Sequence, residues 1–487
     1  MGGSIIQSLT PHRRSLFGFL VVIVVLNGFW FFGFLNKSVE PEALQVLPVD
    51  RTGVSVQDPW KLSPADNLNF PFPTLTAREN LRNDTFYVTG FALAGFTNQF
   101  IAFMHLIYLG LQSERIPVIP PFTPSHMSDN AGALRFGTVM NMTSLSKVLR
   151  RPILEWSDVK DYPANGSVIL THKPTDPAVE HIGCWSLRQR SLKIPVWVPM
   201  SENILKIDLS FTRVPGFAFF EEKEESELQL KFPALASLIV PKHPHPAAKN
   251  QPLMVPSKMG SKLKPDEHMA CFDFMYYIST GVKKYEFENR WSLAWNSVGK
   301  HIKFTDEMLA LAKEYLTRSL YGDQAAGQTD IPPIITVHIR RGDFKTHCAN
   351  GQKAPCYPPL SKYRQVIEKV QAEVLKTLNI NATRVIVASG KHPRSNYHAL
   401  EVIASLPLDE SDPKFWEEVT SFGWNYLDHT VERTMERYGE WYPVLIDKVA
   451  LSMGIGFVGT EGSTFSILNA RRVEDWNGGA TDMVSFR

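Results

Sequence analysis

Residues 441–472 read WYPVLIDKVALSMGIGFVGTEGSTFSILNARR, and this stretch decides the fold class. The largely apolar run over 441–453 predicts a buried helix, and the run over 454–460, with glycines and apolar residues, predicts a strand. A second helix is expected over 463–472. A helix, a strand and a helix in this order are typical of an α/β domain with a mostly parallel sheet.

The same alternation continues upstream of this stretch. We expect a helix over 305–316, with Thr305 as its N-cap and acidic residues in its first turn. The run IITVHIR at 334–340 predicts a buried strand. A helix over 361–378 and a strand over 384–389 follow it. These elements predict that the C-terminal part is one Rossmann-like unit.

A second unit of this kind is expected near the start of the globular part. Residues 85–91 (TFYVTGF) predict a strand, 98–112 a buried helix and 115–122 the next strand. Two such units facing each other would hold a ligand in a cleft at the carboxyl ends of their strands. Residues 221–266 begin EEKEESE and later become proline-rich, so they predict a surface loop insert. The middle of the chain carries no motif.

The N-terminus predicts a membrane anchor. Residues 15–35 read SLFGFLVVIVVLNGFWFFGFL without a charge, which is long enough to span a bilayer. Arg13 and Arg14 precede the run, so the positive-inside rule places 1–14 in the cytosol and the remainder in the lumen. The alternative is a cleaved signal sequence. The proline-rich segment 36–80 is interpreted as a stem.

Length and composition agree with two globular domains. The chain has 487 residues with 44% hydrophobic and 21% charged side chains, a balance typical of globular protein. We predict an N-terminal domain over 81–300, on the acceptor side, and a C-terminal nucleotide-binding domain over 301–487. The net charge is +2, which gives no argument for a nucleic-acid partner.

Four cysteines are compatible with two disulfides in an oxidising compartment. Cys348 and Cys356 are close enough in sequence to close one loop, which leaves Cys184 with Cys271, although other pairings stay open. No CxxC pair occurs, so a zinc site is not expected. Sequons for N-glycosylation begin at Asn36, Asn83, Asn141, Asn165 and Asn381.

The first candidate site follows the strand at 334–340, where the chain reads HIRRGD. Side chains alternate along a strand, so His338 and Arg340 share one side and Ile339 takes the other. Arg340 offers a planar, permanently charged fork that suits phosphate oxygens. The alternative for Arg340 is a structural ion-pair network at the end of the strand.

The second candidate is the turn GTEGSTFS, which carries Ser463, Thr464 and Phe465 between a strand and a helix. Free backbone N–H groups, the positive end of a helix dipole and hydroxyl groups meet at such a turn, and this combination suits a diphosphate. The alternative is ordinary N-capping of the helix by one of the hydroxyls. Phe465 taken alone is more typical of a core residue.

The third candidate is the loop Gly95-Phe96-Thr97-Asn98, where a glycine allows a ligand to approach the backbone and Asn98 opens a helix. A simple turn with a cap is the alternative. Asp447 is the fourth candidate, because an acid in an apolar helix can accept hydrogen bonds from the amino edge of guanine; pairing with Lys448 is the alternative. No P-loop sequence occurs, and no acidic cluster suggests a metal.

Three blocks together resemble the GDP-fucose-dependent fucosyltransferase superfamily, which includes protein O-fucosyltransferases and core α1,6-fucosyltransferases. They are the strand ending in HxRR, the GxxNQ loop and the block DKVALSMGIGFVGTEGSTFS. The resemblance is local, but the blocks occur in the family's order. It implies a GT-B fold, GDP-fucose as donor, no metal or other cofactor, and transfer with inversion to a protein or glycan acceptor.

Carried over to this chain, the resemblance assigns a role to each candidate. Arg340 corresponds to the arginine on the β-phosphate and is the expected catalytic residue, and His338 lies near the nucleotide. Residues 95–98 correspond to the donor loop, Asp447 to the acid that reads guanine, and residues 463–465 to the turn around the diphosphate. The resemblance with the N-terminal anchor implies a type II membrane protein of the Golgi or endoplasmic reticulum.

Two departures from the family pattern limit the expectation. Ala94 stands where some protein O-fucosyltransferases carry an acidic candidate base, so no general base is named. Residues 388–390 read Ala-Ser-Gly where several relatives read Ala-Thr-Asp. A transferase for another GDP-sugar, or a membrane-anchored nucleotide-sugar-binding protein without catalysis, therefore remains an alternative.

Overall fold

The computed structural model describes residues 60–124, 127, 131–163, 176–188, 198–220, 230–280, 285–328, 330–342, 344, 357–389 and 413–486, which lie within one compact unit, 58–487. The predicted cytosolic tail, the anchor at 15–35 and the stem up to residue 59 lie outside the described residues. Among the helices that the structure describes, none is both long enough and apolar enough to cross a membrane.

The N-terminal half of this unit contains a sheet of seven strands, all parallel to their neighbours except the last, which is antiparallel. In spatial order they are β3 (Leu154–Glu155), β2 (Ile116–Ile119), β1 (Tyr87–Gly90), β8 (Met269–Phe272), β4 (Glu180–Ser186), β5 (Ile207–Arg213) and β7 (Leu253–Val255). Strands β6 (Leu230–Lys231) and β9 (Ile278–Ser279) form a separate pair. The predicted strands at 85–91 and 115–122 are confirmed in position, each shorter than expected.

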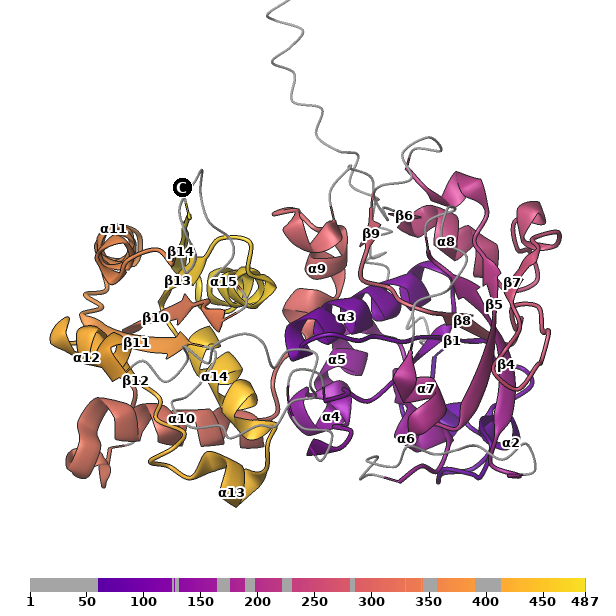
Figure 1. The fold of residues 1–487 in the computed structure, drawn as a ribbon, viewed down its shortest axis with the longest axis horizontal. Helices are drawn as coiled ribbons and strands as arrows, with labels where there is room; N and C mark the ends of the chain where they lie inside the picture. The colour runs from indigo at the N-terminus through magenta and orange to yellow at the C-terminus, as the bar shows by residue number, and fades with distance from the viewer. Residues whose placement is uncertain are drawn as a thin grey trace, which may run out of the picture. The chain divides into compact units, whose positions relative to one another are not determined.

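The C-terminal half contains a second, fully parallel sheet of five strands. Its order is β12 (Asn425–Tyr426), β11 (Arg384–Ser389), β10 (Ile334–Ile339), β13 (Gly456–Thr460) and β14 (Ala480–Val484). The helices are arranged about it as Figure 1 shows: α10 (Asp306–Tyr321), α11 (Leu360–Leu378), α12 (Pro413–Ser421), α14 (Tyr442–Ser452) and α15 (Thr464–Asn477). The expected α/β class with parallel sheets is confirmed; the cleft between two domains stays a prediction.

Strand β10 shows how the alternation of side chains organises this half. Ile335, Val337 and Ile339 pack in one apolar cluster with residues of α11 and α12. Thr336 points to the other face, where its hydroxyl donates to the carbonyl of Leu451 in α14 at 2.7 Å. His338 follows Thr336 on that face, so the strand delivers it toward α14 and α15.

The insert predicted over 221–266 is wrong as a continuous loop, although 221–229 lie outside the described residues. Helix α8 (Phe232–Ile239) begins with a proline at its first turn and buries its apolar side chains in the same cluster as those of α3 (Phe96–Gln112). Strand β7 completes the edge of the seven-stranded sheet. The acidic and proline-rich flanks obscured an apolar run, KFPALASLIV, that is long enough for two helical turns.

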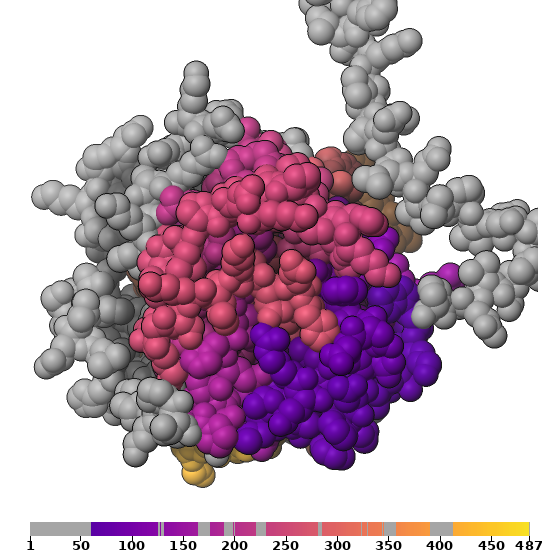
Figure 2. Space-filling view, turned by 90° about the vertical axis from the view of Figure 1, so that its right-hand side faces the viewer, coloured from indigo at the N-terminus to yellow at the C-terminus, as the bar shows by residue number. Residues whose placement is uncertain are grey.

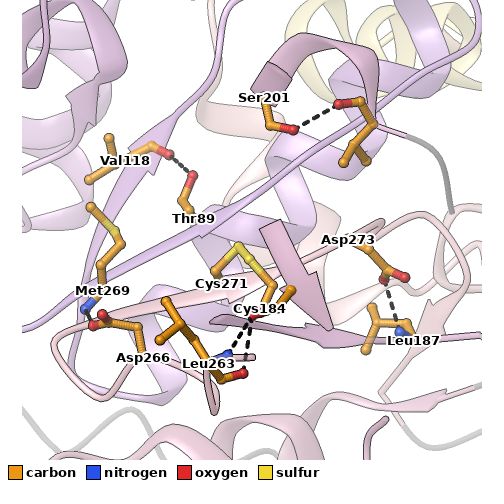
Figure 3. Close-up of a disulfide and its surroundings, with 12 residues drawn as sticks. Thr89, Val118, Cys184, Leu187, Ser201, Leu263, Asp266, Met269, Cys271 and Asp273 are labelled. Carbon is orange, nitrogen blue, oxygen red and sulfur yellow. Dashed lines mark hydrogen bonds between the residues drawn. A yellow bond between two sulfur atoms is a disulfide. The ribbon is translucent and has the colours of Figure 1, made fainter. Parts of the chain in front are cut away.

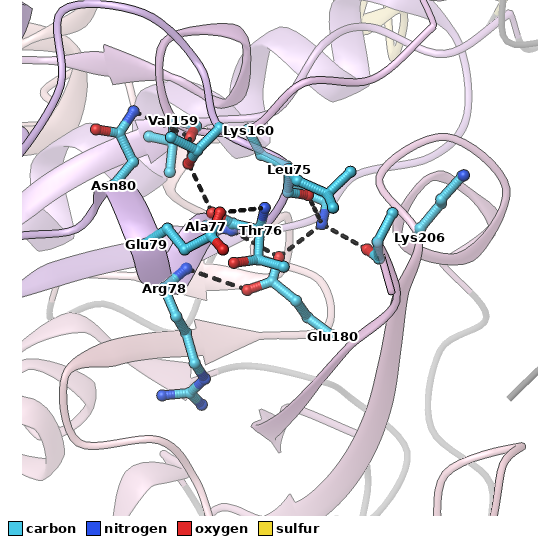
Figure 4. A network of polar contacts seen from close by, with 12 residues as sticks. Leu75, Thr76, Ala77, Arg78, Glu79, Asn80, Val159, Lys160, Glu180 and Lys206 are labelled. Atoms are coloured by element: carbon cyan, nitrogen blue, oxygen red, sulfur yellow. Dashed lines mark hydrogen bonds and ion pairs between the residues drawn. The ribbon is translucent and has the colours of Figure 1, made fainter. Parts of the chain in front are cut away.

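The predicted stem is wrong for residues 60–80, which pack on the globular part. Leu68, Ala77 and Asn80 are buried, and α2 (Ala77–Asn80) is held by the carboxylate of Glu180, which accepts bonds from the backbone N–H of Ala77 at 2.7 Å and of Arg78 at 3.1 Å (Figure 4). In the space-filling view, the indigo N-terminal part of the described chain lies directly against magenta and salmon residues from the middle of the chain (Figure 2). Pro64 begins the 3-10 turn η1 (Pro64–Asn67) in this segment.

A disulfide joins Cys184 of β4 to Cys271 of β8, which are neighbouring strands (Figure 3). This confirms one of the pairings considered above, whereas Cys348 and Cys356 lie outside the described residues. Of the sequons, those at 36 and 165 also lie outside. Asn83 and Asn381 are exposed, and Asn141 is half-buried, where its side chain caps helix α5 (Met142–Leu149).

The remaining helices of the described residues are short. They are α4 (Phe136–Val139), α6 (Trp156–Val159), α7 (Pro199–Asn203), α9 (Leu293–Ser297), α13 (Thr434–Tyr438) and the 3-10 turns η1 (Pro64–Asn67), η3 (Gly216–Ala218), η4 (Pro246–Ala248), η5 (Glu286–Glu288), η6 (Gly299–His301) and η7 (Gly322–Ala325). His245 caps η4 by accepting from the N–H of Ala247 at 3.2 Å.

Candidate functional site

The carboxyl ends of two adjacent parallel strands, β10 and β13, bring the first two candidate motifs together. His338 lies near the end of β10 and Arg340 directly after it, while Thr460 ends β13 and the turn at 461–463 leads into α15. Because the ends of neighbouring parallel strands meet at one edge of a sheet, the two motifs form one site although more than a hundred residues separate them in sequence.

The hydroxyl of Thr460 fixes the backbone around Arg340. It accepts a bond from the N–H of Arg340 at 2.8 Å, contacts the carbonyl of His338 at 3.1 Å and pairs with the hydroxyl of Tyr363 at 2.7 Å. A threonine hydroxyl has one proton to donate and two lone pairs, so these three contacts use its full capacity. Burial raises the pKa of Tyr363 to about 12, so the phenol stays protonated and can donate.

A second buried network sets the side chain of His338. Its Nδ1 lies 2.7 Å from the hydroxyl of Ser466, which also accepts from the N–H of Thr460 at 3.0 Å. The imidazole ring stacks on Phe465, with 4.5 Å between ring centroids. Burial, with the charges of Arg340 and Lys448, holds the pKa of His338 well below 6.5, so the ring is neutral at physiological pH.

Lys448 on α14 contacts Phe465. Its Nζ donates to the carbonyl of Phe465 at 3.0 Å and sits 3.9 Å from the centre of the phenyl ring. The side chain is fully buried, and desolvation together with the charge of Arg472 lowers its pKa well below 10.5. The ring of Phe465 therefore contacts both Lys448 and His338, and these two contacts hold its position.

The turn before α15 presents hydrogen-bond donors. Ser463 caps the helix, with its hydroxyl accepting from the N–H of Ser466 at 3.4 Å, and Gly462 has φ +76°, a left-handed conformation suited to glycine. The N–H groups of the first helical turn have no partner within the helix, and they carry the positive end of its dipole. Beside Arg340, this terminus is suited to a diphosphate.

The N-terminal candidate loop reaches the same turn. The hydroxyl of Thr464 donates to Oδ1 of Asn98 at 2.8 Å, which joins the third candidate motif to the second. The left-handed residue of this loop is Ala94, at φ 74°, whereas Gly95 is extended and serves as the N-cap of α3. Gln99 stabilises this strained backbone by donating to the carbonyl of Ala94 at 2.7 Å.

Two residues of that loop point into the protein. Phe96 is buried and packs on Phe122, with 4.4 Å between ring centroids, and on Trp441. Thr97 is also buried, and its hydroxyl makes no hydrogen bond within the described part of the chain. Asn98 is thus the member of the loop whose side chain reaches the turn at 463–465, and the roles expected for Phe96 and Thr97 stay predictions.

Asp447 lies on α14, one residue before Lys448, and is nearly buried. Its Oδ1 accepts from Nε2 of His429 at 2.9 Å, so the expected alternative of pairing with Lys448 is wrong. Among the described residues, no group of three or more His, Cys, Asp or Glu side chains is arranged to hold a metal ion.

Sequence reasoning missed the residues that hold the candidate side chains. They are Thr460, Ser466, Tyr363, Lys448 and His429. The first two stand inside the motif GTEGSTFS, so a hydroxyl count at the strand end was an available signal. Tyr363 lies on α11 and His429 lies between β12 and α13, and only tertiary packing brings them to Thr460 and Asp447.

No protein-family model and no curated protein matches the chain. Among solved structures, the chain is similar to apo POFUT1 (TM-score 0.45, 14% identity, covering 82% of this chain and 98% of that chain) and to POFUT1 in complex with GDP-fucose (0.46, 13%, 83% and 98%). It is also similar to NodZ α-1,6-fucosyltransferase soaked with GDP-fucose (0.35, 12%, 80% and 92%). These neighbours are fucosyltransferases, the class that the sequence blocks resemble, but at TM-scores below 0.5 the function proposed for this chain must rest on its own residues.

Proposed function

We propose that this chain is a glycosyltransferase that takes fucose from GDP-fucose. The observation that carries the proposal is the hydrogen bond between Thr464 and Asn98, because it joins the two loops that the sequence motifs assign to the donor. Arg340 belongs to the same site through Thr460, whose N–H is bonded to Ser466 of that turn. Three motifs that are far apart in sequence thus converge.

The chemistry suits this arrangement. When a sugar leaves GDP, negative charge grows on the β-phosphate, so groups that are more favourable to that charge than to the ground state accelerate the step. Arg340 and the N-terminus of α15 are such groups; the backbone of Arg340 is fixed by Thr460 and the helix is capped by Ser463 without a ligand. Loss of one preorganised donor of this kind typically costs about 3–4 kcal/mol of barrier.

The finer parts of the proposal concern stereochemistry, acceptor and location. We propose transfer with inversion and without a metal, to a protein or glycan acceptor, in the lumen of the Golgi or endoplasmic reticulum. The disulfide between Cys184 and Cys271 supports an oxidising compartment, where such bonds persist. The uncharged segment at 15–35 supports a single N-terminal anchor.

The first experiment measures the melting temperature of the detergent-solubilised full chain while nucleotides are titrated in. GDP, ADP and UDP are compared, with Arg340→Ala as the matched variant. A ligand that binds only the folded state stabilises it by RT ln(1 + [L]/Kd), about 2.7 kcal/mol at a hundredfold excess over Kd. We expect stabilisation by GDP alone, and less of it in the variant.

Turnover is then measured with GDP-fucose and GDP-mannose by the release of GDP. Release from GDP-fucose in the presence of a glycoprotein acceptor mixture is expected, with a fall of about a hundredfold or more in Arg340→Ala. Stabilisation by GDP without turnover of either sugar nucleotide would indicate a binding protein. A folded chain that no nucleotide stabilises would contradict the proposal.

A further inference from the structure

A chain of hydrogen bonds leads from α10 to the carboxylate of Asp447. The hydroxyl of Tyr315 in α10 lies 2.7 Å from the hydroxyl of Thr434, at the start of α13. That hydroxyl lies 3.0 Å from Nδ1 of His429, and Nε2 of the same ring lies 2.9 Å from Oδ1 of Asp447. All four side chains are largely or fully buried, so the bonds are shielded from water.

The carboxylate decides the direction of the bond between His429 and Asp447. A carboxylate oxygen accepts hydrogen bonds, so Nε2 of His429 carries a proton and donates a hydrogen bond to Oδ1 of Asp447. On the other side of the ring, Nδ1 and the hydroxyl of Thr434 form a second hydrogen bond, and Thr434 forms a third with Tyr315. The imidazole ring is therefore held at both nitrogens.

The other carboxylate oxygen of Asp447 has no such partner. Oδ2 makes no hydrogen bond with the described residues, and the side chain remains 12% exposed. A carboxylate has about four lone-pair positions, of which His429 occupies one. The carboxylate can therefore accept two neighbouring N–H groups from a ligand, in a plane that the imidazole determines.

We propose that His429 is a positioning residue for base specificity, which holds Asp447 so that the carboxylate accepts the ring N–H and the amino group of guanine. This inference rests on the proposed use of a GDP-sugar and adds the residue that selects its base. A carboxylate free to rotate could satisfy the ring N–H alone, whereas a fixed one meets both donors. A purine without the amino group then leaves one buried acceptor unpaired.

The test compares GDP with inosine diphosphate, which keeps the ring N–H and lacks the amino group. Dissociation constants of both are measured for the full chain by calorimetry, with ADP as a purine that offers no ring N–H. The wild type should prefer GDP over inosine diphosphate by about ten- to a hundredfold, the factor expected for one hydrogen bond to a charged group. Asp447→Asn should lose this preference.

Two variants separate positioning from a general role in folding. His429→Leu removes the donor and should bring the preference for GDP down to about threefold or less. His429→Gln can place an amide N–H where Nε2 was, so it should retain most of the preference. Thr434→Val, which leaves the imidazole in place but removes its fixed partner, should give an intermediate ratio.

The ratio of the two affinities is the decisive quantity, because a structural defect weakens both nucleotides by the same factor. If His429→Leu, or Thr434→Val where the first variant does not fold, binds both more weakly at an unchanged ratio, the positioning role is overturned. If the wild type binds GDP but does not prefer it, the inference fails while the donor site stands. If the wild type binds neither nucleotide, the proposed function fails with it.

Discussion

Two fully buried lysines, one beside each large sheet, differ in the acceptors that their ammonium groups find. Lys160, beside the first sheet, lies 2.7 Å from the carboxylate of Glu180 and also donates to the carbonyls of Leu75 at 3.0 Å and Ala178 at 2.7 Å. Lys448, beside the second sheet, donates to one carbonyl and faces a phenyl ring. The ammonium of Lys160 thus has three acceptors, one of them a carboxylate, whereas that of Lys448 has one, a neutral carbonyl.

The difference separates a structural network from a candidate site. The ammonium of Lys160 and both carboxylate oxygens of Glu180 have hydrogen-bond partners, and these bonds attach the segment around α2 to the sheet (Figure 4). Near Lys448, burial and the charges of Arg340 and Lys448 lower the pKa of His338, and burial lowers the pKa of Lys448 itself. Perturbed ionisation without a compensating partner is typical of functional sites.

The largest effect is expected when the satisfied network is broken. Lys160→Met should leave the carboxylate of Glu180 buried without its cation, and removal of one partner from a buried ion pair typically costs about 3–5 kcal/mol. The free energy of unfolding, measured by urea denaturation of the full chain, should fall by this amount. The double variant Lys160→Met with Glu180→Leu should recover part of it.

The matched control is the more exposed pair of Lys206 and Asp176, with 3.0 Å between Nζ and Oδ2 and side chains 24% and 29% exposed. Lys206→Met should change stability by about 1 kcal/mol or less, because exposed pairs contribute little. A loss for Lys160→Met as small as that for Lys206→Met would contradict the structural role of the buried pair.

Lys448→Met should instead raise the free energy of unfolding. The unfolded chain holds a proton on this lysine up to about pH 10.5, whereas the folded chain releases it at a much lower pH. The unfolded state therefore binds more protons, and wild-type stability should rise by about 1.4 kcal/mol per pH unit above the folded pKa and below 10.5. The variant lacks this rise, so its advantage should shrink as the pH increases.

Urea denaturation at pH 8, 9 and 10 measures this directly, as the difference in unfolding free energy between the variant and the wild type. The same series on Lys448→Arg keeps the charge and should be less stable than the wild type throughout. A difference between Lys448→Met and the wild type that is independent of pH would show that Lys448 keeps its proton in the folded protein.

Much of the second half could be predicted from the sequence, since its strands are apolar runs bounded by turns. The helix over 305–316 and its Thr305 cap, the strand over 334–340 and the turn around Ser463 all appear in the structure, although α10 continues to Tyr321. Strand β14 was missed, because the sequence ATDMV is partly exposed and shows no alternation. It forms by pairing along β13, a tertiary contact that no local pattern records.

The first half was less predictable for a physical reason. Most strands of its sheet come from 150–280, where the helices between strands, α6, α7 and α8, have only 4, 5 and 8 residues, too few to show a clear helical period in the sequence. The prolines of 60–80 suggested an extended stem, whereas Pro64 starts a turn and the segment packs on the globular part. For the site, the motifs located Arg340, Asn98 and Thr464, and Thr460 stands in the same turn motif, whereas Tyr363 and His429 come from other segments and follow only from packing.

A smaller effect is expected at the hydroxyl that holds Arg340. Thr460→Val keeps the shape but leaves the N–H of Arg340, the phenol of Tyr363 and the carbonyl of His338 without this partner. Unfolding free energy should fall by about 1–3 kcal/mol, and kcat of GDP-fucose turnover should fall about tenfold with KM nearly unchanged. Thr460→Ser, which retains the hydroxyl, should restore kcat; failure of the serine variant to do so would contradict the positioning role.

The smallest effect is expected for the bond between Thr464 and Asn98, which joins two neutral, half-buried groups. Asn98→Ala should cost about 0.5–1.5 kcal/mol of unfolding free energy, the usual contribution of one such hydrogen bond. A double-mutant cycle with Thr464→Val isolates the pair, since both single variants also lose contacts of their own. A coupling energy near zero without nucleotide that rises when GDP is bound would mean that the ligand forms the contact. A coupling near 1 kcal/mol in both states would mean that the two loops are joined before the donor arrives, which is the preorganisation that the site needs to stabilise a developing charge.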